Sequence, residues 1–240
     1  GLLPSEGLRG KQLALIGAGS LGSMIGNVLA EAGVGQFTII DNDQLDGANL
    51  SRHLCGLGDI GRCKAAALAD SLRGRAVQVD PRDVDVLDLA DADLRAVIQS
   101  PDLVVATTDS PAVQFLVNES CVRTGTPGLF VGAYERAHAG EIIVVRSGVG
   151  ACLFCAVGFR TGVAPGVETN ERRLAYQDAD AERLDAEPGL GADIAFLSSV
   201  AAAHALALLD PGGSRTDLLQ DGRFLLLHGG SRPDGQLAEI

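Results

Sequence analysis

The sequence predicts an α/β domain built on a Rossmann-like, doubly wound and mostly parallel sheet, with antiparallel strands added at one edge. Two observations support this fold class. Apolar strand-like runs alternate with helical patterns through the first half of the chain, which is typical of βαβ units. A glycine motif follows the first of these runs and opens the first helix. The 240 residues are enough for one core, so we expect a single domain over residues 1–240, cut from a longer protein.

The expected elements follow from periodicity and from glycine and proline positions. Parallel strands are predicted at residues 13–16, 37–40, 76–79, 103–106 and 129–131. Helices are predicted at residues 20–32, 63–73, 90–99 and 111–124. Residues 141–146 and 223–227 are predicted to add the antiparallel strands, and residues 160–190 to form a mobile crossover loop. Residues 192–209 are almost entirely apolar, so we expect a helix buried in the core or against another subunit.

Three glycines, Gly17, Gly19 and Gly22, form a G-x-G-x-x-G motif between the first predicted strand and the first helix. Glycine permits positive φ and lets the backbone approach a phosphate, which binds where free N–H groups begin a helix. Asp41 ends the second predicted strand, where a carboxylate accepts hydrogen bonds from ribose hydroxyls. The pattern predicts a nucleotide site. The alternative is a structural glycine turn followed by an ordinary surface carboxylate.

Composition excludes several classes of partner. The net charge of -12 and the pI near 4.6 argue against nucleic acid, which basic surfaces bind. We expect no membrane span, because no apolar run approaches the roughly 20 residues that a span needs, and we see no signal peptide. Five scattered cysteines do not form a disulfide framework and suit a reducing compartment. We therefore expect a cytoplasmic protein.

Further polar residues follow the glycine motif in a fixed order. They are Asp41-Asn42-Asp43, Asn49-Leu50-Ser51-Arg52, Asp59-Ile60-Gly61 with Lys64, and Thr107-Thr108-Asp109. This order resembles the ThiF/MoeB family, relatives of the ubiquitin-activating enzymes, over about residues 8–210. The resemblance implies ATP-dependent adenylation of a carboxylate, above all the C-terminal glycine of a ubiquitin-like or sulfur-carrier protein. It also implies a dimer, which we expect to be a homodimer.

Adenylation needs a nucleophile in line with the α-phosphate, cations against developing charge and a carboxylate that holds Mg²⁺ on the leaving pyrophosphate. Arg52 and Lys64 would supply the cations and Asp109 would hold the metal, and these three are the predicted catalytic residues. The predicted nucleotide-binding residues are Gly17, Gly19, Gly22, Asp41, Asp43, Asn49, Arg52 and Lys64. Structural alternatives are a solvated helix face for either cation and a helix N-cap for Asp109 before Pro111.

Cys152 and Cys155 form a C-x-x-C pair, which in the resembling family provides half of a four-cysteine zinc site. No second pair occurs in this sequence. Zinc completed by His204 or His228 is one interpretation, and a vestigial pair packed as small apolar residues is another. Cys155 is also the thiol nearest to the region where thioester-forming relatives carry a nucleophile.

The chain departs from the family pattern at two further places. His53 stands where the family's N-L-x-R-Q motif ends in glutamine, and the arginine-bearing N-terminal helix of relatives is absent, because Arg9 lies too close to the first strand. Either the chain is a domain cut from a longer protein, or the missing cation comes from elsewhere. Alternative functions are a catalytically silent scaffold subunit of a heterodimeric activating enzyme, adenylation of a small-molecule or tRNA-nucleoside carboxylate, and NAD-dependent oxidoreduction.

Overall fold

A seven-stranded sheet forms the centre of the part of the chain that the computed structural model describes, which comprises residues 6–75, 77–133, 139–156, 191–213, 218 and 225–228. The strands are β1 (Gln12–Ile16), β2 (Gln36–Ile40), β3 (Gln78–Arg82), β4 (Leu103–Ala106), β5 (Gly128–Ala133), β6 (Ala139–Val145) and β7 (Leu225–His228). Their order is β3-β2-β1-β4-β5-β6-β7. The first five pair in parallel, and β6 and β7 are antiparallel additions at one edge. The predicted fold class is confirmed.

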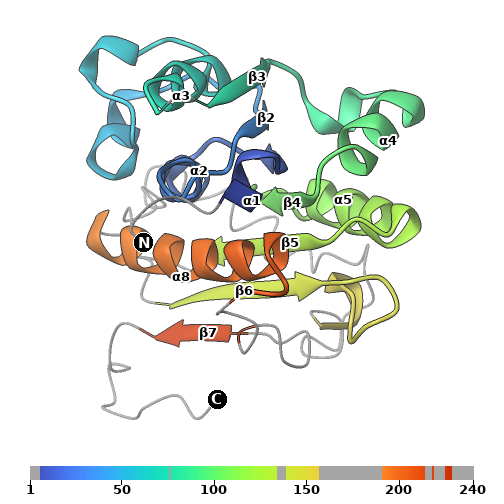
Figure 1. Cartoon of the computed structure of the whole chain (residues 1–240). Helices are drawn as coiled ribbons and strands as arrows, with labels where there is room; N and C mark the ends of the chain where they lie inside the picture. Colours follow the sequence, from blue (N-terminus) through green and yellow to red (C-terminus); the bar gives the residue numbers. More distant parts are fainter. Residues whose placement is uncertain are drawn as a thin grey trace, which may run out of the picture.

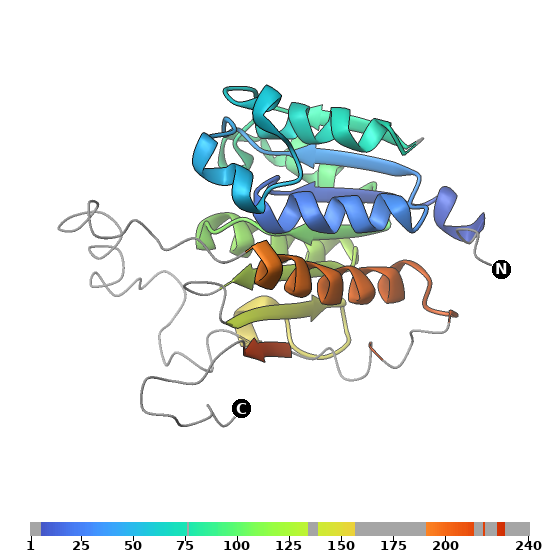
Figure 2. The same ribbon diagram turned by 90° about the vertical axis from the view of Figure 1, so that its left-hand side faces the viewer.

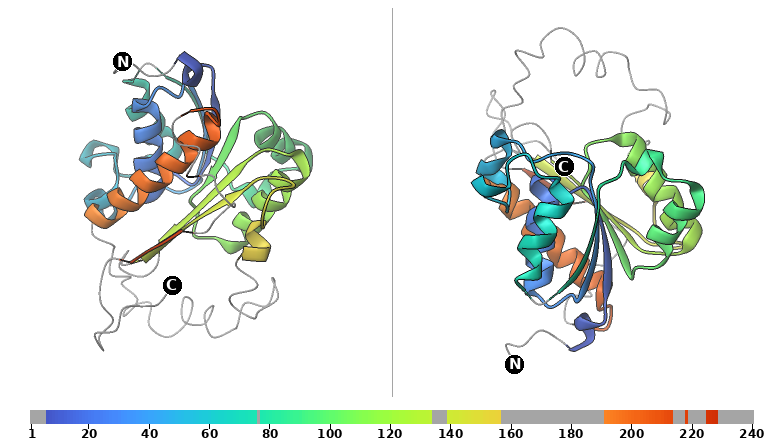
Figure 3. Two further views of the ribbon diagram at one scale, coloured as in Figure 1. Left: turned by 60° about the horizontal axis from the view of Figure 1, so that its bottom comes forward. Right: turned by 90° about the horizontal axis from the view of Figure 1, so that it is seen from above.

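Helices cover both faces of the sheet. They are α1 (Glu6–Arg9), α2 (Ser20–Glu31), α3 (Lys64–Arg73), α4 (Asp91–Gln99), α5 (Pro111–Thr124) and α8 (Gly191–Leu209). Short 3₁₀ helices are η1 (Gly47–Arg52), η2 (Leu57–Asp59) and η3 (Val86–Asp88). Figures 1 to 3 show α2, α3 and α8 on one face and α4 and α5 on the other. This is the three-layer arrangement of a doubly wound sheet.

The core consists of two apolar layers, one on each face of the sheet. Along β1, Leu13 and Leu15 belong to the layer under α2, α3 and α8, whereas Ala14 and Ile16 belong to the layer under α4 and α5. All four are at most 1% exposed. Strands buried on both faces have continuous apolar sequences rather than alternating ones. This explains why β1 and β4 are recognisable in the sequence as uninterrupted apolar runs.

Helix α8 packs against α2, β4, β5 and β6, and it passes very close to β6. A Cβ added to Gly140 would lie 2.3 Å from Leu197 Cδ2 and 3.1 Å from Gly132 O, so a larger residue there would displace the Leu197 side chain. With 19 residues and a mean hydropathy of 1.7, α8 is long and apolar enough to cross a membrane by length and composition. The expectation that no apolar run approaches this length is therefore wrong. The packing accounts for the composition, since 56% of the apolar window is buried.

Most predicted elements agree with the structure within two or three residues, but β3 is shifted. Its prediction at residues 76–79 becomes Gln78–Arg82, a mostly polar strand that includes Pro81. Because β3 is the edge strand of the sheet, proline and polar side chains are tolerated there, and hydrophobicity marks its position poorly. The four-residue α1 was not predicted. The predicted crossover loop at residues 160–190 lies outside the described residues.

Candidate nucleotide site

The glycine motif and Thr107 lie at the carboxyl ends of the adjacent strands β1 and β4. The chain leaves β1 toward α2 on one face and leaves β4 toward α5 on the other (Figure 3). Such a switch point opens a crevice at the carboxyl edge of a parallel sheet, and ligands of doubly wound folds bind there. The main chain holds the two strand ends together, because Thr107 N–H donates to Ile16 O at 2.8 Å.

The three glycines of the motif have different tasks. Gly17 has a φ of +96°, and a Cβ there would lie 3.0 Å from both Thr107 Oγ1 and Thr108 N. A Cβ at Gly22 would lie 2.1 Å from Gly17 O, well inside contact distance. A Cβ at Gly19 would meet nothing within 4 Å. Gly17 and Gly22 are therefore needed by the turn itself, whereas Gly19 borders open space that a ligand can enter.

The start of α2 is suited to an anion. Gly19 is the N-cap residue and provides no side-chain cap, and the first turn of α2 holds no acidic residue. The first N–H groups of a helix lack intrahelical partners and carry the positive end of the helix dipole. Phosphate oxygens satisfy such groups. The predicted phosphate-binding turn therefore has the required backbone geometry.

The Asp41 carboxylate bridges the glycine turn and the turn at Asp43 through two hydrogen bonds. Its Oδ2 accepts from Ala18 N–H at 2.6 Å and its Oδ1 from Asp43 N–H at 2.8 Å. Burial raises the pKa of Asp41 above its ordinary value, and these two hydrogen bonds oppose that shift. Each carboxylate oxygen retains a second lone pair, so the predicted ribose contact remains compatible with both bonds. The sequence predicted the ligand role of Asp41 and missed this structural one.

Lys64 begins α3 and is held by Asp43. Its N–H donates to Asp43 O at 2.8 Å, and its Nζ lies 2.8 Å from Asp43 Oδ2. The Lys64 side chain is only 13% exposed, so the alternative of a solvated helix face is wrong for it. Asp43, predicted as a nucleotide ligand, is the ion-pair partner of Lys64, and an arriving phosphate would compete with Asp43 for this cation.

Asn49 and Arg52 both make hydrogen bonds inside η1. Asn49 Oδ1 accepts from Asp46 N–H at 3.0 Å, which completes a capping box at the start of η1. Arg52 Nη1 donates to Ala48 O at 3.0 Å. A guanidinium group has five N–H donors, so this contact occupies only one of them. The structure places both residues on η1 near the crevice, and their predicted contacts with a nucleotide remain predictions.

Asp109 lies between β4 and α5 with its side chain exposed. The N-cap of α5 is Ser110, whose Oγ accepts from Val113 N–H at 3.4 Å, and Pro111 follows at the first helical position. The N-cap interpretation of Asp109 is therefore wrong, and its carboxylate faces solvent.

In the described part of the chain no three His, Cys, Asp or Glu side chains cluster as metal ligands. One carboxylate still suits Mg²⁺, which takes its other ligands from phosphates and water.

His53 is the site residue whose role the sequence did not indicate. It is only 6% exposed, and its Nε2 lies 2.7 Å from Ala18 O in the glycine turn. Its Nδ1 accepts from Cys55 N–H at 3.1 Å. Burial is the main cause of a lowered His53 pKa. In the sequence, the only indication of a role for this residue is that histidine stands in place of the glutamine of the family motif.

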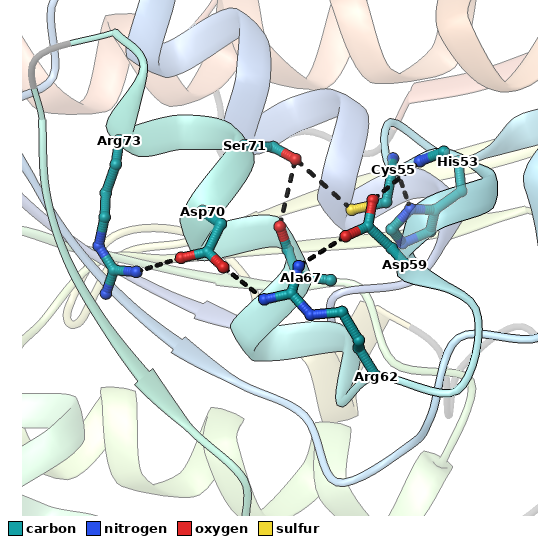
Figure 4. A network of polar contacts seen from close by, with 9 residues as sticks. His53, Cys55, Asp59, Arg62, Ala67, Asp70, Ser71 and Arg73 are labelled. Atoms are coloured by element: carbon teal, nitrogen blue, oxygen red, sulfur yellow. Dashed lines mark hydrogen bonds and ion pairs between the residues drawn. The ribbon is translucent and has the colours of Figure 1, made fainter.

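The segment after His53 is fastened to α3 by a chain of polar contacts (Figure 4). Cys55 Sγ lies 3.7 Å from Ser71 Oγ. Arg62 pairs with Asp59 at 2.6 Å and also with Asp70 on α3. These groups are partly or largely exposed, so the pairs contribute little free energy. Their effect is geometric, because they fix the loop that leads to Lys64.

The C-x-x-C pair lies after β6, with Cys152 and Cys155 Sγ atoms 3.7 Å apart. In the parts of the chain with described side chains, no third metal-binding side chain joins this pair. His204 is buried in α8, where its Nδ1 lies 2.9 Å from Val200 O, and the side chain of His228 lies outside the described residues. Zinc binding by the two cysteines stays a prediction.

Two hollows of about 310 and 530 Å³ open at the opposite, amino-terminal edge of the sheet. The first is lined by the starts of β1, β2 and β3, and the second by the ends of α2 and α3. None of the predicted site residues lines either hollow. The predicted site residues therefore lie away from both hollows, at the carboxyl edge of the sheet.

A doubly wound sheet with an anion-binding turn at its switch point and a carboxylate after β2 defines a nucleotide-binding α/β protein. The chain belongs to the ThiF family, whose model matches residues 4–228. It is 33% identical over 150 residues to "Adenylyltransferase and sulfurtransferase UBA4" of Yarrowia lipolytica, covering 62% of this chain and 37% of that protein. It is 30% identical over 200 residues to "Adenylyltransferase and sulfurtransferase MOCS3" of Mus musculus, covering 79% of this chain and 40% of that protein.

The chain thus spans well under half the length of these curated relatives. Among solved structures, E. coli MccB with ATP matches with a TM-score of 0.71 at 19% identity, over 95% of this chain and 67% of that chain. PaaA matches with a TM-score of 0.71 at 16% identity, over 94% of this chain and 75% of that chain. At these identities the likeness of the structures concerns the fold.

Proposed function

We propose that this chain uses ATP and Mg²⁺ to adenylate a carboxylate, and that its substrate is the C-terminal glycine of a ubiquitin-like or sulfur-carrier protein. The observation that carries the proposal is the set of groups at one sheet edge. An open anion-binding turn at Gly19, the carboxylates Asp41 and Asp109, and the shielded cation Lys64 all lie at the carboxyl ends of β1, β2 and β4 or on α3. The named relatives described above are adenylyltransferases.

Each group has a task in this reaction. The turn at Gly19 and the start of α2 bind phosphate oxygens, and Asp41 accepts hydrogen bonds from the ribose. A carboxylate oxygen of the substrate attacks the α-phosphorus, the bond from that phosphorus to the pyrophosphate oxygen breaks, and acyl adenylate and pyrophosphate form. Lys64 and Arg52 stabilise the charge on the phosphates as this bond breaks. Asp109 would hold Mg²⁺, which when bound neutralises charge on the leaving pyrophosphate.

The arrangement fits adenylation better than hydride transfer. Redox chemistry on a nicotinamide does not require a cation or a metal-binding carboxylate beside the phosphates, whereas phosphoryl and nucleotidyl transfer depend on both. Lys64 is shielded from solvent and held in place by Asp43, which an ordinary surface lysine is not. Holding a lysine side chain in one position costs conformational entropy, and this cost supports a functional role for the charge of Lys64.

We also propose that two copies of the chain associate as a homodimer. Phe196 on α8 is 61% exposed, although the opposite side of the same helix is packed on the sheet and on α2. A large aromatic side chain on a long apolar helix is a suitable anchor for a two-fold interface, because the same patch is then buried on both copies.

The test of the function is exchange of radiolabelled pyrophosphate into ATP, screened over candidate carrier proteins that end in Gly-Gly. The proposal predicts exchange only with the correct carrier and only with Mg²⁺. ATP binding without exchange for any carrier would favour the scaffold alternative. Tight NAD binding without ATP binding would overturn the proposal.

A further inference from the structure

Both ring nitrogens of His53 are engaged, and their partners fix the tautomer. Cys55 N–H is a donor, so the Nδ1 that it approaches at 3.1 Å must be unprotonated. Ala18 O is an acceptor, so the Nε2 that lies 2.7 Å away must carry the hydrogen. Figure 4 shows the His53 ring beside Cys55. His53 is therefore a neutral imidazole that donates to the glycine turn.

The Ala18 carbonyl that His53 binds belongs to the same peptide as the Gly19 N–H group. In a trans peptide the C=O and N–H bonds point in opposite directions. A carbonyl held toward His53 therefore directs the Gly19 N–H away from His53. A Cβ at Gly19 would meet nothing within 4 Å, so open space borders this residue and a ligand can approach it.

A second contact fixes the neighbouring peptide of the turn. Ala18 N–H donates to Asp41 Oδ2 at 2.6 Å, and Ala18 itself is fully buried. Asp41 and His53 thus hold Ala18 by its N–H and its C=O. Two anchored peptides leave the turn little freedom, which is what preorganised binding of a phosphate requires.

We propose that His53 is a positioning residue for the nucleotide, holding the Ala18 carbonyl so that the Gly19 N–H faces the ATP phosphates. The role deepens the proposed function and rests on it. His53 directly follows Arg52 at the end of η1, so the same contact anchors the loop that carries this predicted cation. Glutamine, which the family motif carries at this position, has an amide N–H donor and a carbonyl acceptor, and it can replace both ring contacts.

Two variants of His53 separate this role from simple core packing. His53→Phe keeps the volume of the ring and removes its donor and acceptor, and we expect the Kd for Mg-ATP to rise about tenfold. His53→Gln restores both groups and should bind Mg-ATP within about threefold of the unsubstituted chain. The matched control is His204→Phe, since His204 is 7% exposed and lies in α8. Its Kd should stay within about twofold of the original value.

The measurement is titration calorimetry with Mg-ATP at pH 7.5, on variants that circular dichroism shows to be folded. Pyrophosphate exchange measured over a range of ATP concentrations up to saturation then gives kcat and the KM for ATP separately. A positioning role predicts that His53→Phe raises the KM for ATP more than it lowers kcat at saturation, whereas loss of folded protein would lower the apparent kcat alone.

Acidification offers a second measurement if His53→Phe does not fold. Protonation of His53 would put a hydrogen on Nδ1, which faces the Cys55 N–H. Two donors would then meet, and the hydrogen bond from Cys55 N–H to Nδ1 would be lost. The charged groups that act on His53 are Asp41, Asp59 and Lys64, of which the two carboxylates favour its protonation and Lys64 opposes it. As the pH is lowered from 7.5 to below the ordinary pKa range of histidine, the unsubstituted chain should lose several-fold more ATP affinity than His53→Gln, because burial places the protonation of His53 below that range. The titration of ATP itself cancels in this comparison.

The results distinguish the two proposals. Failure of the unsubstituted chain to bind Mg-ATP would overturn the proposed function and this inference with it. Binding by the unsubstituted chain, with a Kd for His53→Phe within twofold of it, would overturn the positioning role alone. Equal losses in His53→Phe and His204→Phe, or superimposable pH profiles for the unsubstituted chain and His53→Gln, would also overturn it.

Discussion

The third glycine of the motif gives the sharpest prediction about the turn. In Gly22→Ala the new Cβ would lie 2.1 Å from Gly17 O and 2.7 Å from Thr107 Oγ1, whereas ordinary contact begins at 3.4 Å. The first neighbour is backbone, so it cannot rotate away. The start of α2 and the turn must separate by more than an ångström, and this opens the phosphate-binding site.

Overpacking of this kind costs about 1–3 kcal/mol. Alanine would recover roughly 0.5–1 kcal/mol, because it loses less conformational entropy in a helix than glycine. For a domain of this size each kcal/mol shifts the melting temperature by about 2–4 °C, so we expect Tm to fall by several degrees. Mg-ATP binding should be lost at the same time.

Gly19→Ala is the matched control, because a Cβ at Gly19 meets nothing within 4 Å and the φ of −74° suits alanine. We expect its Tm to stay within about 2 °C, since the loss of a glycine N-cap and the reduced entropy of the unfolded chain roughly cancel. Its ATP affinity should still fall, because the methyl group enters the open side of the turn. Differential scanning calorimetry and ATP titration measure both quantities. Equal Tm values for Gly22→Ala and the unsubstituted chain would refute the argument.

Four further outcomes are expected. Asp109→Asn should abolish pyrophosphate exchange and leave Tm unchanged, because the side chain is exposed; a collapsed melting transition would show that it is structural instead. Lys64→Ala should lower kcat more than ATP affinity, and equal effects would contradict a transition-state role. Because burial lowers the His53 pKa, the folded state should lose stability as pH falls below about 6.5, with a slope of at most about 1.4 kcal/mol per pH unit that His53→Gln removes. Phe196→Glu should convert dimers to monomers in light scattering, and a monomeric unsubstituted chain would contradict the dimer proposal.

The parallel strands and their helices could be predicted because their burial is recorded in local sequence. Residues 103–106 are apolar throughout and are buried on both faces, and proline at position 111 marks the start of α5. Edge strand β3 could not be placed as well, since its polar residues and Pro81 carry little hydrophobic signal. The sequence therefore predicts most accurately the strands that are buried along their whole length.

The candidate site was predictable in its residues and not in their contacts. The glycine spacing and Asp41 predicted a nucleotide site, yet the bond from Ala18 N–H to Asp41 joins residues 23 apart in the chain, and the bond from His53 to Ala18 joins residues 35 apart. No local pattern encodes such pairs. From the sequence Asp109 is a candidate helix cap before Pro111, whereas in the structure Ser110 has the geometry of an N-cap and takes that place.

Detection of the acyl adenylate itself tests the central claim most directly. The chain is mixed with Mg-ATP and a carrier protein ending in Gly-Gly, the reaction is quenched in acid, and the intact carrier is weighed by mass spectrometry, with Asp109→Asn as the inactive control. Our account predicts a carrier that has gained one AMP in the reaction with the unsubstituted chain and no gain with the variant. An unmodified carrier across the candidate set, from a chain that binds Mg-ATP, would contradict it.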